Sequence, residues 1–262
     1  MALTIGIFGS FVGSFLNVVI YRIPLRRSIV SPPSACTQCG MRIKGYDNIP
    51  VLSWLILRGK CRTCSSPISM RYPIVELFTG VFFGLVAWKF HANASALLVA
   101  FLYLAAVSVV LALIDMDTHT LPNRIVIPSY IIGIVLLGLT DVINGNHGAI
   151  IRGLVGMISL GLFYFGMALI HPGGMGMGDV KFAGVLGLFL GYLGWSVLLV
   201  GAFSAFVLGG IFAIALIMFR GVGRKSGIPF GPWMLIGAWV GVFFGTSIVH
   251  QYLSLFGLSN HI

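Results

Sequence analysis

Long apolar stretches dominate this chain and constrain most strongly how it can fold. Each runs for about 20 mostly apolar residues, the length that an α-helix needs to cross the hydrocarbon core of a bilayer. The stretches are residues 2–20, 73–90, 94–114, 125–143, 150–170, 182–198, 200–219 and 232–253. Only glycines and a serine divide the sixth from the seventh, but 182–219 is too long for one crossing. The sequence therefore predicts an all-α polytopic membrane protein with about eight transmembrane helices.

Charged residues are rare, and their scarcity excludes several classes of protein. They make up 8% of the chain, against about 25% in a soluble globular domain, so an ordinary soluble enzyme is excluded. Hydrophobic residues make up 58%, and disorder requires low hydrophobicity with high charge. The acidic residues are Asp47, Glu76, Asp115, Asp117, Asp141 and Asp179. With so few carboxylates, each one calls for an explanation.

The distribution of basic residues predicts the orientation in the membrane. The net charge is +10, and nine of the 16 lysines and arginines fall in residues 21–72. Loops rich in Lys and Arg stay in the cytoplasm, so this segment is expected to be cytoplasmic and the N-terminus outside. Alternating crossings then place fourteen of the 16 basic residues on the cytoplasmic side. The charge thus indicates topology in a lipid bilayer, and no nucleic-acid partner is expected.

These assignments divide the chain into three parts. Residues 1–20 form a first transmembrane helix. A cleavable signal peptide has basic residues before its apolar stretch, and none is present here, so we expect this helix to be retained. Residues 21–72 form a large cytoplasmic loop, and residues 73–262 form a transmembrane domain with the other seven helices. Two pairs of glycines four residues apart, 187 with 191 and 237 with 241, predict close contact between helices.

All four cysteines lie in the cytoplasmic loop, as two C-x-x-C pairs. They are Cys36, Cys39, Cys61 and Cys64. This spacing can supply four thiolates to a tetrahedral Zn²⁺, and Gly40 follows the first pair where a tight turn is needed. Two disulfides or four free thiols are the alternatives, although the cytosol keeps thiols reduced. A closed Cys₄ zinc site is structural, and it would stabilise a loop too small to fold alone; we expect Trp54 and Leu55 to pack on it.

Two aspartates lie at the ends of apolar stretches. Asp115 ends the third stretch and Asp179 precedes the sixth, 64 residues later. The charge-based topology places both on the cytoplasmic side at similar depth. Two carboxyl groups in one site share a proton, and such a pair activates water in aspartic proteases. Alternatively, Asp179 caps the sixth helix, and Asp115 is a polar residue at a helix end.

Glu76 is the acid best placed for a further functional role. It lies one turn inside the second stretch, near its cytoplasmic end. An acid within a membrane segment suggests function, but an ion pair with Arg71 or Lys181 is an equal alternative.

The positions of the remaining three acidic residues suggest no specific function. Asp117 is two residues from Asp115 and therefore on a different face of the helix. Asp141 lies at an outer end of a predicted span, and Asp47 is expected to be solvated in the loop.

A series of short motifs extends along nearly the whole chain. In order, they are residues 13–22 (GSFLNVVIYR), the two C-x-x-C pairs, 71–76 (RYPIVE), 114–117 (IDMD), 121–123 (LPN), 176–181 (GMGDVK) and 229–232 (PFGP). The series resembles the type IV prepilin peptidases, or leader peptidase/N-methyltransferases, of the GxGD class of membrane aspartic proteases. Each motif alone is weak. In this order, over nearly the whole chain, they are specific to the family.

The resemblance implies an endopeptidase with Asp115 and Asp179 as its catalytic pair. Gly176, Gly178 and Lys181 belong to the supporting GxGD motif. The family cleaves the short basic leader of prepilins and pseudopilins after a glycine, on the cytoplasmic face of the bacterial inner membrane. The basic loop would repel a basic leader, so recognition is expected to rest mainly on the hydrophobic segment of the substrate.

The resemblance also implies methylation of the new N-terminus with S-adenosylmethionine. The sequence carries no G-x-G-x-x-G loop after a strand and no segment long enough for a Rossmann unit. A cofactor site is therefore expected in the cysteine loop, residues 21–72, and the adjoining helices, with Glu76 as the candidate residue. A transporter or a non-catalytic pilus or secretion assembly factor are the alternative functions.

Overall fold

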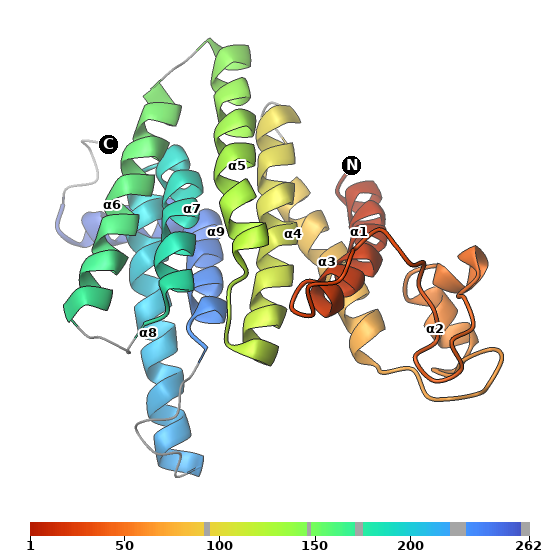
Figure 1. Ribbon diagram of the computed structural model, residues 1–262. Helices are drawn as coiled ribbons and strands as arrows, with labels where there is room; N and C mark the ends of the chain where they lie inside the picture. Colours follow the sequence, from red (N-terminus) through yellow and green to blue (C-terminus); the bar gives the residue numbers. More distant parts are fainter. Residues whose placement is uncertain (92–94, 146–147, 171–174, 221–228, 258–262) are drawn as a thin grey trace. The chain divides into compact units, whose positions relative to one another are not determined.

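The computed structural model describes residues 1–91, 95–145, 148–170, 175–220 and 229–257 (Figure 1). Throughout these ranges the regular structure is helical and no strand is assigned. Isolated antiparallel bridges join Ala35 to Arg42 and Lys60 to Pro67. The predicted all-α class is confirmed.

The helices follow the apolar stretches of the sequence. Their bounds are α1 (Ala2–Arg22), the 3₁₀ helix η1 (Gly45–Asn48), α2 (Leu52–Ile56), α3 (Arg71–Lys89), α4 (Ser95–Thr118), α5 (Asn123–Asn144), α6 (Gly148–Ile170), α7 (Met177–Leu193), α8 (Trp195–Arg220) and α9 (Gly231–Leu255). Within the described ranges, seven of them are long and apolar enough to cross a membrane: α1, α3, α4, α5, α6, α8 and α9. The chain is therefore a multi-pass membrane protein.

The eighth expected span is α7, which differs from the others. It has 17 residues and is about 25 Å long at 1.5 Å per residue. It runs five residues earlier than the predicted 182–198, because the chain breaks at Gly194, where φ is 154°. A conformation of this kind favours glycine. The expected division between the sixth and seventh helices is thus confirmed, with α8 beginning at Trp195.

The chain groups into two compact units, Met1–Leu113 and Ile114–Ile262. The boundary falls within α4, which contributes residues to both units. The expected three-part division, at residues 20 and 72, stays a prediction.

In the first unit, α1 packs closely against α3 through small residues. A methyl group on Gly13 would lie 2.8 Å from the Cα atom of Glu76, and one on Gly9 would lie 2.6 Å from the Cβ atom of Phe83. Only glycine permits this approach of the backbones. The contact fixes the part of α3 that carries Glu76.

In the second unit, α7 is the central helix. It contacts α5, α6, α8 and α9, and its residues from Phe182 to Tyr192 are all buried. A helix that is apolar on all sides is expected in the interior of a bundle. In Figure 1, α6 and α7 run side by side, and a methyl group on Gly187 would lie 2.3 Å from the carbonyl oxygen of Gly156.

The second predicted glycine pair joins α9 to α8. A methyl group on Gly237 would lie 2.4 Å from the backbone nitrogen of Ala205, and one on Gly241 would lie 2.6 Å from the carbonyl oxygen of Val197. The close helix contact expected from these glycines is confirmed. These packed faces hold α7 and α9, whose first turns carry Asp179 and Gly231.

Candidate active site and metal centre

Asp115 lies in the last turn of α4, and its side chain is buried. It is 4% exposed, and its Oδ2 atom accepts a 3.0 Å hydrogen bond from the backbone N–H of Gly231, the first residue of α9. Asp117, two residues later, is exposed, as expected for another face of the helix. The PFGP motif thus reaches Asp115 from a position 116 residues away.

Asp179 lies in the first turn of α7 and is half-buried. Its Oδ2 atom accepts a 3.2 Å hydrogen bond from the N–H of Gly176, the residue before the helix. The capping alternative therefore applies in part, although Asp179 is the third residue of the helix and not its cap. Capping does not exclude a second role, because the other carboxylate oxygen is not used by this contact.

The GxGD segment packs against the chain that follows Asp115. A methyl group on Gly178 would lie 3.1 Å from the Cβ atom of Leu121, and Lys181 Nζ donates a 3.2 Å hydrogen bond to Asn123 Oδ1. Tyr130 on α5 donates its hydroxyl to the carbonyl oxygen of Lys181. These contacts bring the two aspartate motifs together within the second unit, and an electrostatic interaction links Asp179 to Asp115.

Two residues of this region were assigned no role from the sequence. Gly231 belongs to a quoted motif, but nothing in that motif shows that its amide meets Asp115. Tyr164 on α6 is 1% exposed, interacts electrostatically with Asp179, and has its ring centroid 6.3 Å from that of Phe230. A single tyrosine in an apolar helix gives no signal of this proximity.

The four cysteines form a compact cluster in the first unit. The sulfur atoms of Cys36, Cys39, Cys61 and Cys64 all lie within 4.8 Å of one another. The Cys36 and Cys64 sulfurs are 3.8 Å apart. In a tetrahedral site with Zn–S bonds of about 2.3 Å, the sulfurs are about 3.8 Å apart. The cluster therefore fits a metal ion, as the spacing predicts.

The two C-x-x-C pairs have the same backbone geometry. Cys36 and Cys61 each donate their N–H to the carbonyl oxygen five residues later, and each accepts the N–H of the residue four positions later. That residue, Gly40 in one pair and Ser65 in the other, has a positive φ of 69° or 57°. The turn expected at Gly40 is confirmed. Hydrogen bonds from the backbone at Cys39 and from Ser66 lower the pKa of the Cys36 thiol to about 6, which favours the thiolate that a metal binds.

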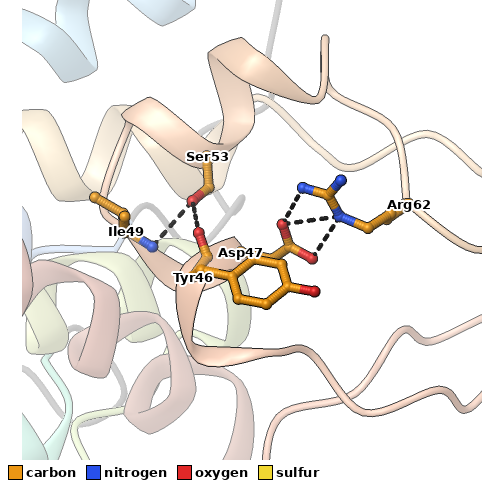
Figure 2. A network of polar contacts seen from close by, with 5 residues as sticks. All are labelled: Tyr46, Asp47, Ile49, Ser53 and Arg62. Atoms are coloured by element: carbon orange, nitrogen blue, oxygen red, sulfur yellow. Dashed lines mark hydrogen bonds and ion pairs between the residues drawn. The ribbon is translucent and has the colours of Figure 1, made fainter.

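A polar network ties the second cysteine pair to η1 (Figure 2). Arg62 Nε and Nη2 both donate hydrogen bonds to Asp47, the shortest 2.6 Å, and the Arg62 guanidinium lies 5.5 Å from the centre of the Tyr46 ring. Ser53 Oγ donates to the Tyr46 carbonyl oxygen and accepts the N–H of Ile49. The expectation that Asp47 is solvated is wrong, because its side chain is only 10% exposed and forms an ion pair with Arg62.

Trp54 and Leu55, expected to pack on the metal site, lie differently. The Trp54 indole N–H donates to the carbonyl oxygen of Ile68, and its ring lies against Gly59, where a methyl group would be 2.8 Å away. Leu55 is 57% exposed. Trp54 therefore packs within the loop, whereas Leu55 does not.

A cavity of about 430 Å³ opens between the loop and the adjoining ends of α1 and α3. Its lining includes Asn17 and Tyr21 of α1, Trp54 of the loop, and Tyr72 and Glu76 of α3. Asn17 is 8% exposed and donates to the carbonyl oxygen of Tyr72. Glu76 Oε2 accepts a 2.7 Å hydrogen bond from the N–H of Val51. This bond fastens the loop to α3, and the suggested ion pair with Arg71 or Lys181 stays a prediction.

Comparison with known proteins gives two family matches. Residues 7–90 match the bacterial peptidase A24 N-terminal domain, and residues 102–214 match the type IV leader peptidase family. The second match contains both Asp115 and Asp179.

Several curated proteins are similar over nearly their whole length. A prepilin leader peptidase/N-methyltransferase of Pseudomonas putida is 34% identical over 96% of this chain and 93% of its own. One of Aeromonas salmonicida is 34% identical over 95% and 92%, and one of Neisseria gonorrhoeae is 34% identical over 89% and 87%. No solved structure matches the chain.

Proposed function

This chain belongs to the type IV leader peptidase family, and we propose that it cleaves the basic leader of prepilins or pseudopilins after a glycine and methylates the new N-terminus. The names of its relatives support both activities. They do not favour a transporter or a non-catalytic assembly factor. The excess of basic residues in 21–72 supports a site on the cytoplasmic face of the bacterial inner membrane.

One observation carries the peptidase proposal. Asp115 and Asp179 lie at the ends of two different helices of the second unit, and each accepts a backbone N–H. A methyl group on Gly178, beside Asp179, or on Gly231, the donor to Asp115, would lie within 3.3 Å of the same residue, Leu121. Paired carboxyl groups in a partly buried site hold one proton between them. This is the arrangement required for acid–base activation of water at a peptide bond.

The proposed reaction uses the pair in its singly protonated form. The ionised carboxylate accepts a proton from a water molecule, whose oxygen bonds to the scissile carbonyl carbon, while the protonated carboxyl group donates to the carbonyl oxygen. In the second step, the proton taken from water passes to the amide nitrogen and the C–N bond breaks. The addition of water forms a tetrahedral diol, and one of its hydroxyl groups then gives a proton to the carboxylate that had protonated the carbonyl oxygen. This restores the starting pair.

The test is the paired substitution of the two aspartates. Asp115→Asn and Asp179→Asn are expected each to abolish leader cleavage, by at least about 10³-fold, in full-length protein purified in detergent with a prepilin substrate. Asp117→Asn, on the exposed face of the same helix, is the matched control and should cleave normally. Normal cleavage by either the Asp115 or the Asp179 variant would contradict the aspartic mechanism.

For methylation, the cavity of the first unit is the proposed cofactor site. Its volume of about 430 Å³ lies in the range of small-molecule sites. The aromatic rings of Trp54 and Tyr72 and the carboxylate of Glu76 suit a ligand with both an aromatic base and a positive charge. S-adenosylmethionine has both, and it would supply a methyl group from its sulfonium sulfur to the new α-amino group.

Two substitutions at Glu76 separate the charge from the hydrogen bond to Val51. Glu76→Gln keeps an acceptor for the Val51 N–H but removes the charge, whereas Glu76→Ala removes both. If the charge attracts the cofactor, both variants lose S-adenosylmethionine affinity in calorimetry and N-methylation by mass spectrometry. Cofactor binding at normal affinity by Glu76→Ala would contradict the assignment of this cavity.

A further inference from the structure

The first N–H groups of α9 donate to different kinds of acceptor. The opening amides of a helix lack acceptors within the helix. In α9, Trp233 and Met234 both donate to the carbonyl oxygen of Phe230, and Pro232 has no N–H to give. The Gly231 N–H is directed instead to Asp115 Oδ2, at 3.0 Å in buried surroundings.

The glycine at this position is required by space and not by backbone conformation. Gly231 is not among the described residues with positive φ. A methyl group on it would lie 2.6 Å from Asp115 Oδ2 and 3.2 Å from Asp115 Cγ. Any side chain at residue 231 must therefore displace the carboxylate of Asp115, although the helix itself would accept it.

The two aspartates are held in different ways. Asp179, which is half-buried, accepts its N–H from the exposed Gly176, three residues earlier in the chain. Asp115 accepts its N–H from a separate helix, in a buried position. The N-terminus of α9 carries a partial positive charge, and a donated N–H favours the charged form of a carboxyl group. Both effects act on Asp115 from a separate helix and in buried surroundings. Asp179 has the N-terminus of its own helix, α7, but its hydrogen bond is exposed to solvent, which weakens such an interaction.

We propose that Gly231 is a positioning residue that holds Asp115 as the ionised member of the pair through Oδ2. Asp115 then accepts the proton from water through its other oxygen, and Asp179 carries the proton that is donated to the scissile carbonyl oxygen. This assignment of roles rests on the proposed peptidase function. It adds a third residue, from the PFGP motif, that acts on the chemistry through Asp115.

The first test is Gly231→Ala, measured with full-length protein in detergent and a prepilin substrate. The kcat for cleavage should fall at least about tenfold with KM changed less than about twofold, because the substrate contacts are retained. The acidic limb of the kcat–pH profile should move about one unit toward higher pH, since the ionised base is less stabilised. Gly210→Ala is the matched control, because nothing lies within 4 Å of a methyl group there.

A second variant removes the Gly231 N–H without adding a side chain that could disturb folding. Glycolic acid at residue 231, introduced by nonsense suppression, replaces the amide with an ester and leaves the Cα unchanged. It should show the same shift of the acidic limb and the same fall in kcat. A normal pH profile and kcat in this variant, with Asp115→Asn and Asp179→Asn inactive, would overturn the role of Gly231 but not the peptidase function. Cleavage by those two variants would instead overturn the peptidase function itself.

Discussion

The Tyr192 hydroxyl of α7 donates a 2.7 Å hydrogen bond to Asp141 Oδ1 at the end of α5. Asp141 is 2% exposed, and its Oδ2 atom accepts the N–H of Ile150 in the first turn of α6. Arg152 donates to the carbonyl oxygens of Gly191 and Tyr192. Asp141, to which no role was assigned from the sequence, is therefore a structural link among three helices of the second unit, α5, α6 and α7.

Removal of this link should destabilise the second unit. Tyr192→Phe leaves a buried carboxylate without its hydroxyl donor, which typically costs about 1.5–3 kcal/mol. Thermal unfolding in detergent would show the loss. Tyr252→Phe, at a 60% exposed position, is the control and should leave the unfolding temperature unchanged. Equal stability of the two variants would contradict the structural role of Asp141.

The contact between α6 and α7 should be intolerant of a single methyl group. Gly187→Ala places a carbon 2.3 Å from the Gly156 carbonyl oxygen, so the two helices must separate. Overpacking of this kind costs about 1–3 kcal/mol, and thermal unfolding measures it. Gly166→Ala on α6, with open space around its methyl group, should be neutral or slightly stabilising, since Ala favours a helix more than Gly does.

The cysteine cluster should bind about one Zn²⁺ per chain, measured by metal analysis of purified protein. Substitution of all four cysteines by Ser should abolish the bound metal and expose residues 36–64 to limited proteolysis, because the loop has little apolar core. Gln38→Ala, at an exposed position within the first pair, should retain the metal and the protection. Full protection in the four-serine variant would contradict a structural metal.

The Asp47–Arg62 pair should make the loop slightly more stable near neutral pH than in acid. The hydrogen bonds of Arg62 hold the pKa of the Asp47 carboxyl below its usual range. A lowered pKa contributes stability above the unfolded value of about 3.9, and this stability is lost as the pH falls through the folded pKa. The pair is at the surface, so the effect is small.

The measurement for this pair is the protease sensitivity of the loop as a function of pH. Asp47→Asn should be cleaved faster than the natural chain at about pH 6, and the difference should shrink as the pH falls through the lowered pKa of Asp47 in the folded loop. Acid weakens metal binding by the same four cysteines in both proteins, so the difference between them reports the ion pair. A difference in cleavage rate that increased as the pH fell would contradict a stabilising role for the Asp47–Arg62 pair.

Local sequence signals predicted much of the candidate metal site. Two C-x-x-C pairs imply adjacent thiolates, because the spacing within each pair fixes a tight turn, and the structure repeats that turn at Gly40 and Ser65. The partners of Asp47 and Glu76 were not predictable in this way. Arg62 and Val51 are their partners because of the path of the loop, which no periodic pattern records.

By itself, the sequence determined that this is a helical membrane protein with a cysteine loop, and it singled out Asp115 and Asp179 as acids at the ends of apolar stretches. Hydropathy and charge report whether each segment prefers lipid or water, which is a local property. The tertiary structure alone decided that α7 lies buried among four helices, and that the Gly231 amide meets Asp115. Such contacts depend on how glycine faces let helix backbones approach, so they join residues that are distant in the chain.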